Sequence, residues 1–340
     1  MSPQLSVIIP VYNAGDALCA CLDSVLGQRI LDLEVVCVDD GSTDGSDALL
    51  EAYARRDARL KMLRQANRGQ GVARNRGLEC AHGEFVQFVD ADDALAVPDA
   101  LERLLATMRR ERLDTLFFDA QTHVCSESLC GQPLPIRAED YVRRGDYSAV
   151  SSGPDLFAAF LKNREYSPSP CLLMIRRAFL DANHIRFPEA RIFYEDNIFM
   201  TRVLLAAQRA SHRPWQLYRR NVWAGSTMTS SPTVRHLRGW LACYQDARAL
   251  LACAGWDRQM RAVLRDRARI YKLHVRRFLD GHPEIAFAAR SELSSEERCL
   301  LDGIRLYPLH ERIVNGVHCL KDRGLFYTVR RIFAGRERNA

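Results

Sequence analysis

The chain has 340 residues, of which 47% are hydrophobic and 26% charged, and its formal net charge is +6. These values are ordinary for a globular protein. No window approaches the ~20 apolar residues that a membrane span needs, and no signal-peptide pattern opens the chain. We therefore expect a cytoplasmic protein, and eleven cysteines without metal or disulfide spacing fit a reducing compartment.

The positive charge is unevenly distributed. Residues 231–340 hold 21 Lys and Arg against 12 Asp and Glu, a surplus of nine, whereas the rest of the chain has three more acidic than basic residues. A basic region beside a mildly acidic body favours an anionic partner, such as a membrane surface, a phosphate-bearing substrate or a nucleic acid. Solvated helix faces would explain the same surplus equally well.

Strand-like and helix-like segments alternate over the first ~120 residues, the pattern of a doubly wound α/β layer. We expect strands at Leu5–Pro10, Glu34–Val38, Lys61–Leu63, Phe85–Val89 and Thr115–Asp119. We expect helices at Ala14–Leu26, Gly45–Arg55, Gly71–Ala81 and from Pro98 to Arg110. The fold class is thus predicted as α/β with a mostly parallel sheet.

The remaining chain reads differently. From Gln121 to Gly153 the pattern is loop-like, and we expect a strand at Leu172–Ile175, a helix at Glu195–Ala207 and a short strand at Leu217–Tyr218. After Pro232 come long Arg-rich helices, broken at Gly255, near Gly281–Pro283 and at Pro308. This last region is predicted to be a helical appendage.

Two acidic clusters follow predicted strands. Asp39-Asp40-Gly41-Ser42 ends the second strand, and Asp90-Ala91-Asp92-Asp93 ends the fourth. Parallel strands present their carboxyl ends to one crevice, and clustered carboxylates repel unless a cation joins them. Helix capping explains single side chains here, but a divalent metal beside a nucleotide pocket explains the pairs better.

Three further motifs are ambiguous alone. Pro10-Val11-Tyr12-Asn13 places an aromatic ring at a strand end, where it could stack on a nucleobase or simply lie in a turn. The loop Asn67–Asn75, which includes Arg74, offers N–H groups and cations to a phosphate, or is a structural turn. Glu195-Asp196 opens a helix, where the dipole favours acidic residues, or supplies a general base.

Taken in order, these segments resemble the family 2 glycosyltransferases, which have a GT-A fold. The resemblance covers roughly residues 4–230 and rests on "LSVIIPVYNAGDALCACLDSVLGQ", "LEVVCVDDGSTDGS", "ANRGQGVARNRGLECAHGEFVQFVDADD" and "FLDANHIRFPEARIFYEDNIFMTRVLL". The stretch "LYRRNVWAGSTMT" is similar to the arginine-then-serine loop of bacterial members that build surface polysaccharides, although Trp223 stands where a second arginine is common.

The resemblance implies an inverting transfer from a nucleotide-diphosphate sugar, most simply a UDP-sugar, to a saccharide or lipid-linked acceptor. Asp196 matches the catalytic base and Glu195 its neighbour, while Asp92 and Asp90 match the metal-binding D-x-D motif for Mn²⁺ or Mg²⁺. The positions implied to bind the nucleotide sugar are Pro10, Tyr12, Asp39, Asp40, Arg74, Asp90, Ala91, Arg220 and Ser226.

The resemblance also implies a division of the chain. Residues 1–120 would be the nucleotide-sugar-binding half, 121–231 the acceptor-binding and catalytic half, and 232–340 a basic helical region. We expect the last region to lie on an anionic membrane surface, with interfacial side chains if these are exposed: Trp240, Trp256, Phe278, Phe326, Tyr327 and Phe333.

Three other functions fit the sequence less well. A dinucleotide-dependent dehydrogenase lacks support because no Gly-rich fingerprint follows the first strand. A non-catalytic sugar-binding relative is disfavoured by the intact set Asp92, Asp196 and Arg220. A nucleic-acid-binding protein would use a basic helix with Arg265, Arg267, Arg269, Arg276 and Arg277. We expect no nucleic acid as a partner.

Overall fold

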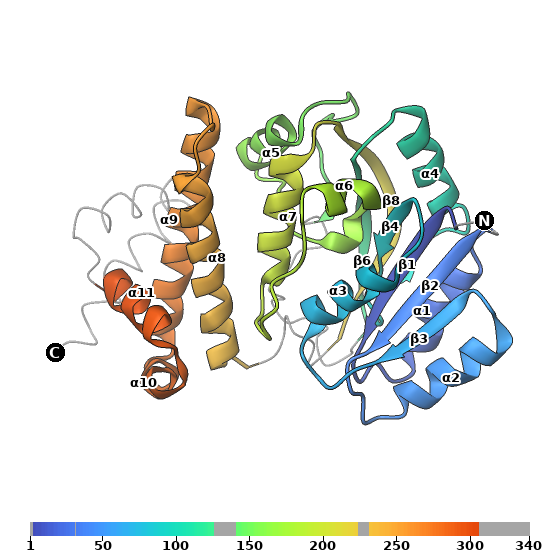
Figure 1. The fold of residues 1–340 in the computed structure, drawn as a ribbon, viewed down its shortest axis with the longest axis horizontal. Coiled ribbons are helices and arrows are strands. Elements are labelled where there is room, and N and C mark those ends of the chain that lie inside the picture. Colours follow the sequence, from blue (N-terminus) through green and yellow to red (C-terminus); the bar gives the residue numbers. More distant parts are fainter. Residues whose placement is uncertain (1–2, 31, 126–140, 224–230, 306–340) are drawn as a thin grey trace.

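The structure is a computed structural model that describes residues 3–30, 32–125, 141–223 and 231–305. Its centre is an eight-stranded sheet in the order β3-β2-β1-β4-β7-β6-β8-β5, with helices on both faces (Figure 1). Helices α8 to α11 stand to one side of the sheet, next to α7 (Figure 1).

The strands are β1 Leu5–Val11, β2 Leu33–Asp39, β3 Leu60–Arg64, β4 Phe85–Phe88, β5 Ala94–Leu95, β6 Thr115–Val124, β7 Leu173–Arg176 and β8 Ala210–Val222. The helices before the last region are α1 Ala17–Leu26, α2 Ser46–Arg56, α3 Gln70–Cys80, α4 Ala100–Arg110, α5 Gly153–Lys162, α6 Arg177–Ala182 and α7 Glu195–Ala206. The last region forms α8 Val234–Ala252, α9 Arg258–Gly281, α10 Pro283–Glu292 and α11 Ser295–Arg305.

The first half of the sheet is parallel, as predicted. Strand β1 lies between β2 and β4 and pairs with both in parallel, and β2 pairs with β3 in the same sense. Every residue of β1 and β2 is buried, which is why both read as continuous apolar runs rather than as alternating patterns. Their carboxyl ends, and that of β4, therefore face the same edge of the sheet.

The second half departs from the prediction. Strand β8 has 13 residues rather than the expected two, and β6 extends to Val124 instead of ending at Asp119. The two pair in parallel with register shifts on both sides of Asp119, and β8 also pairs with β5. Most of β8 was not recognised as a strand because polar residues and Pro214 interrupt its apolar residues. Helix α5 was not predicted, although its buried residues Leu156, Phe157 and Phe160 have helical spacing.

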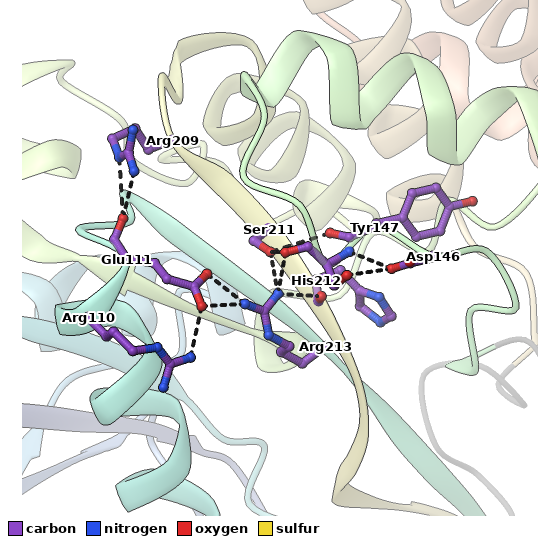
Figure 2. Close-up of polar contacts among 9 residues, drawn as sticks. Arg110, Glu111, Asp146, Tyr147, Arg209, Ser211, His212 and Arg213 are labelled. Carbon is purple, nitrogen blue, oxygen red and sulfur yellow. Dashed lines mark hydrogen bonds and ion pairs between the residues drawn. The ribbon is translucent and has the colours of Figure 1, made fainter.

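A polar network fastens the start of β8 to the end of α4 (Figure 2). Arg213 donates from Nη2 to both carboxylate oxygens of Glu111, at 2.5 and 2.6 Å, and from Nη1 to Ser211 Oγ at 2.6 Å. The guanidinium of Arg209 binds the Glu111 carbonyl oxygen. Charge-assisted hydrogen bonds of this kind fix geometry, so this corner sets where β8 enters the sheet.

The helices of the last region break near Gly255 and at Gly281–Pro283 as predicted, while Pro308 lies outside the described residues. The aromatic side chains Trp240, Trp256 and Phe278 pack against apolar clusters, so the helical-core alternative holds for these three. Among the described helices, none combines the length and apolar composition that crossing a bilayer requires. Phe326, Tyr327 and Phe333 lie outside the described residues.

Candidate active site

The loops after β1 and β2 are bonded to each other. Asn13, in a left-handed conformation at φ 48°, accepts from the Thr43 backbone N–H at 2.8 Å, and Asp44 Oδ2 accepts from the Gly15 N–H at 2.9 Å. Pro10 is buried in β1, and the ring of Tyr12 directly beyond the strand is 50% exposed. These hydrogen bonds fix the loop that follows β1, and an exposed aromatic ring on such a loop is suited to stacking on a flat ligand.

Asp39 and Asp40 are both buried, and their carboxylates organise the neighbouring loops. Asp39 Oδ1 accepts from the Ser42 N–H at 3.0 Å. Asp40 accepts from the backbone N–H groups of Arg68 and Gly69, each at 2.8 Å. Asp40 therefore positions the start of α3, a role that the sequence did not indicate.

Arg74, on α3, joins residues from three separate segments. Its side chain is wholly buried, with Nη2 2.7 Å from Asp90 Oδ1 and Nη1 2.7 Å from Asp196 Oδ1. Nη1 also lies 3.8 Å from Glu195 Oε1. Although burial opposes its charge, Asp196 and Asp90 hold the pKa of Arg74 well above its usual value. Arg74 thus brings the first aspartate of the acidic turn to the predicted catalytic pair.

The acidic turn after β4 uses its members differently. Asp93 is buried and accepts from the Tyr218 hydroxyl at 2.8 Å and the Asn221 N–H at 2.7 Å. Asp90 Oδ1 accepts from Arg74 and from Gln70 Nε2. Asn221 Nδ2 donates to the Asp92 carbonyl oxygen at 2.7 Å, whereas no side chain among the described residues donates to the Asp92 carboxylate. Burial together with the charge of Asp90 raises the pKa of Asp92 to about 6.

This turn fits a divalent cation. The Asp92 carboxylate and the second carboxylate oxygen of Asp90 have no side-chain donor within the described part of the chain. Burial, and then the negative charge of Asp90, raise the pKa of Asp92, and a bound cation would oppose both effects. No group of three or more His, Cys, Asp or Glu suited to a metal occurs among the described residues. Two carboxylates alone match Mg²⁺ or Mn²⁺, which often takes its remaining ligands from phosphate and water. Ala91, between them, is buried.

Glu195 and Asp196 open α7 at the same place. Burial raises the pKa of Asp196 while Arg74 opposes the rise, and burial and then Asp196 raise the pKa of Glu195. The Asp196 side chain remains 29% exposed and so is accessible to a reactant. A partly desolvated carboxylate held by an arginine can accept a proton from a bound hydroxyl.

The turn before this pair is held by the last region of the chain. Tyr194 adopts φ 67°, a left-handed conformation that costs energy for a large side chain, and its ring stacks on Trp240 of α8 at 3.8 Å. A Cβ on Gly239 would lie 2.0 Å from the Phe193 carbonyl oxygen, so only glycine permits this approach of α8. Helix α8 therefore supports Phe193 and Tyr194, the residues that precede Glu195 and Asp196.

Arg220 lies at the end of β8, with its guanidinium 4.4 Å from the Tyr141 ring centroid. Its charge lowers the pKa of Asp92, which places it on the metal side of the candidate site. Ser226 lies outside the described residues. Sequence reasoning missed the supporting side chains Gln70, Tyr218 and Asn221, because uncharged polar residues in a loop or an unrecognised strand carry no distinctive signal.

Comparisons with known proteins agree with this picture. The family model "Glycosyl transferase family 2" matches residues 6–180. The uncharacterized glycosyltransferase YibD of Escherichia coli (strain K12) is 34% identical over 216 residues, and the match covers 64% of this chain and 60% of that protein. Glycosyltransferase GlyG of Streptococcus pneumoniae serotype 4 is 25% identical over 314 residues, covering 88% of this chain and 99% of that protein.

Solved structures are similar as well. S. aureus TarS 1–349 in complex with UDP-GlcNAc has a TM-score of 0.60 at 22% identity, covering 88% of this chain and 79% of that chain. Mannosyltransferase PcManGT from Pyrobaculum calidifontis, in complex with GDP-Man and Mn²⁺, has a TM-score of 0.55 at 19% identity, covering 93% and 84%. These likenesses confirm the predicted GT-A fold with its C-terminal helices.

Proposed function

Because the chain belongs to glycosyl transferase family 2, we propose that it is an inverting, metal-dependent glycosyltransferase. Its donor would be a nucleotide-diphosphate sugar, most simply a UDP-sugar, and its acceptor a saccharide or a lipid-linked saccharide used to build a bacterial surface polysaccharide. The relatives with names in this area include the succinoglycan biosynthesis protein ExoO of Rhizobium meliloti, 29% identical over 225 residues.

The observation that carries the proposal is the bridge made by Arg74. Its two terminal nitrogens each lie 2.7 Å from a carboxylate, Asp90 on one side and Asp196 on the other. A metal-binding turn and a general base must face one substrate for a transferase to work. The buried guanidinium supports the view that Asp90 and Asp196 line one catalytic centre rather than two unrelated acidic turns.

Asp196 would take the proton of the acceptor hydroxyl as that oxygen attacks the anomeric carbon, from the face opposite the diphosphate. The bond to the diphosphate breaks as the new glycosidic bond forms, through an oxocarbenium-like transition state. Glu195 would support the base from the next position, and burial of both carboxyls raises their pKa values toward the range where proton transfer is effective.

The departing diphosphate gains negative charge, so groups that bind it stabilise the transition state more than the bound donor. Arg220 would make such a contact, and Ser226 is proposed as its partner. Asp92 and Asp90 would hold Mg²⁺ or Mn²⁺, which when bound neutralises phosphate charge. Tyr12 would stack on the base, with Pro10, Asp39, Asp40 and Ala91 shaping the nucleotide end.

The same proposal includes three further points. The chain would be divided at residues 120 and 231, it would be cytoplasmic, and it would make peripheral contact with an anionic membrane. A lipid-linked acceptor would be met at a membrane surface, and the surplus of basic residues in 231–340 would favour anionic lipids. On the described part of the rival nucleic-acid helix, Arg267 is buried and Arg269 pairs with Asp266 at 3.3 Å, which weakens that alternative.

A panel of UDP- and GDP-linked sugars, each with Mn²⁺, Mg²⁺ or EDTA, tests the proposal by thermal stabilisation of the purified protein. We expect at least one donor to raise the melting temperature only when metal is present. The responding donor is then tested for transfer, with the anomeric configuration of the product determined by NMR. Retention of configuration would contradict the inverting mechanism, and indifference to all donors would contradict the donor class.

A further inference from the structure

Two arginines outside the groups assigned above lie beside segments of the candidate site. Arg191 precedes α7, and its side-chain stem lies against Gly69, where a Cβ would come 3.2 Å from Arg191 Cγ. The Gly69 N–H in turn binds Asp40. Arg235 is the second residue of α8, and its guanidinium carbon lies 4.4 Å from the Phe193 ring centroid. Arg191 thus lies beside the loop whose N–H groups bind Asp40, and Arg235 lies beside the aromatic residue two positions before Glu195.

The electrostatic neighbours of Arg235 locate it more closely. Burial, and then the positive charge of Arg191, lower its pKa, while Glu195, Asp40 and Tyr12 act in the opposite direction. Arg235 is therefore within electrostatic reach of the nucleotide end, marked by Tyr12 and Asp40, and of the catalytic end, marked by Glu195. The positive charge of Arg191 acts unfavourably on Arg235, and an anion bound by both arginines would relieve that repulsion.

The described residues supply no such anion. Neither arginine forms an ion pair with a carboxylate of the described residues, and Arg235 Nε is buried there without a hydrogen-bond partner. A buried unpaired donor is costly, so an anion that accepted a hydrogen bond from Arg235 Nε would be stabilised there. The adjoining segment 224–230 contains neither Asp nor Glu.

We infer that Arg191 and Arg235 form a binding site for a phosphate or diphosphate group at the junction between α8 and the sheet. The inference deepens the proposed function and rests on it for the source of the phosphate. Because the pair lies between the nucleotide end and the catalytic end, the donor diphosphate is the favoured occupant. A phosphate on the acceptor has the same chemistry and is distinguished by the experiment.

Inorganic pyrophosphate in EDTA is the first probe, since its binding depends neither on the donor sugar nor on a metal. Its dissociation constant is measured by calorimetry for the full chain and for Arg191→Gln, Arg235→Gln and the double variant. We expect each single change to weaken binding about tenfold, the loss of one charge-assisted interaction. Arg248→Gln is the matched control, because Arg248 is an exposed arginine on the same helix. Circular dichroism checks that each variant is folded, and Arg235→Lys should recover part of the affinity.

Nucleotides identify the source of the phosphate. If the pair binds the donor, UDP or GDP should lose affinity in the double variant while uridine and guanosine bind unchanged. Unchanged affinity for UDP and GDP, beside lost pyrophosphate binding, would overturn the donor assignment in favour of the acceptor. Pyrophosphate binding that survives in the double variant, or falls equally in Arg248→Gln, would overturn the site. If the wild type binds pyrophosphate through this pair but neither UDP nor GDP, the proposed function fails and the site stands.

Discussion

Arg74 Nη1 lies 2.7 Å from Asp196 Oδ1, so the proposed general base is paired with a wholly buried cation from a different segment of the chain. The pairing favours the ionised carboxylate against the effect of burial. It also fixes the direction of the carboxylate, because the other end of the guanidinium is held by Asp90.

Arg74→Gln should therefore slow transfer by more than tenfold and move the acidic limb of the pH profile of kcat/KM to higher pH. Removing the cation leaves burial and Asp90 to raise the pKa of Asp196 further, and the base must be deprotonated to act. The profile is measured between pH 5 and 9 beside Arg76→Gln, since Arg76 makes only an exposed pair with Glu79 at 3.3 Å. An acidic limb at the wild-type position would contradict the role given to Arg74.

Asp196→Asn should abolish transfer while leaving donor binding within a few-fold of the wild type. An amide cannot accept the proton, and general base catalysis alone contributes about 10²- to 10⁴-fold. Turnover and donor affinity are measured separately, with Asp99→Asn as control, because Asp99 makes no side-chain cap hydrogen bond at the start of α4. Near-normal turnover of Asp196→Asn would show that another group is the base.

Asp92→Asn should remove the metal-dependent part of donor binding. The lost carboxylate is the one whose pKa burial and Asp90 raise to about 6, and which accepts no side-chain donor in the described residues. Donor affinity is titrated with Mn²⁺ and with EDTA for both proteins. We expect the wild-type difference between the two conditions to shrink at least tenfold in the variant. Asp93→Asn is a poor substitute, since Asp93 is bonded within the fold.

Trp240→Ala should lower both stability and turnover although Trp240 lies on α8. Truncating a large aromatic side chain in a packed site costs roughly 3 kcal/mol, and loss of the stack releases the left-handed Tyr194 ahead of the catalytic pair. A misplaced carboxylate can slow the reaction by up to about 10²-fold. Trp240→Phe, which keeps a stacking ring, should recover most of kcat. A fall in KM alone would not fit this role.

Glu111→Gln tests the network of Figure 2. Burial opposes ionisation of Glu111, but hydrogen bonds from Arg110 and Arg213 hold its pKa below the usual value. The stabilisation is therefore present above the unfolded pKa of about 4.3 and is lost as the pH falls through the lower folded value. We expect the variant to be less stable by about 1 kcal/mol at pH 7, and the difference from the wild type to shrink as the pH falls below about 4.

Urea unfolding across this pH range provides the measurement for Glu111→Gln. Glu102→Gln, an exposed glutamate on the same helix, should change stability by less than about 0.5 kcal/mol at every pH. A difference between Glu111→Gln and the wild type that does not vary with pH would mean that the network acts through packing rather than charge.

The sequence was most informative where burial on both faces leaves an unmistakable pattern. Strands β1, β2 and β4, and the acidic groups that follow β2 and β4, were predicted close to their positions because short, mostly apolar runs have few alternative structures. The helices α3 and α7 were predicted within two residues of their ends.

Such patterns do not show which segments pair when they are far apart in the sequence. Strand β8 is defined by its partners β6 and β5, and its own residues include arginines and a proline that read as loop. Arg74 was predicted as a ligand-binding cation, but its bridge between Asp90 and Asp196 joins positions 16 and 122 residues away. Arg235 carried no signal at all, because its significance depends on how α8 packs beside Phe193.

The left-handed Tyr194 has a consequence for anyone who recombines this chain with its relatives. The Trp240 ring of α8 stabilises this conformation. A crossover between β8 and α8 would therefore place the turn before Glu195 and Asp196 against a helix from another protein. Exchanges meant to alter acceptor choice should instead move residues 183–252 as one block. Hybrids joined inside that block are expected to fold yet turn over slowly.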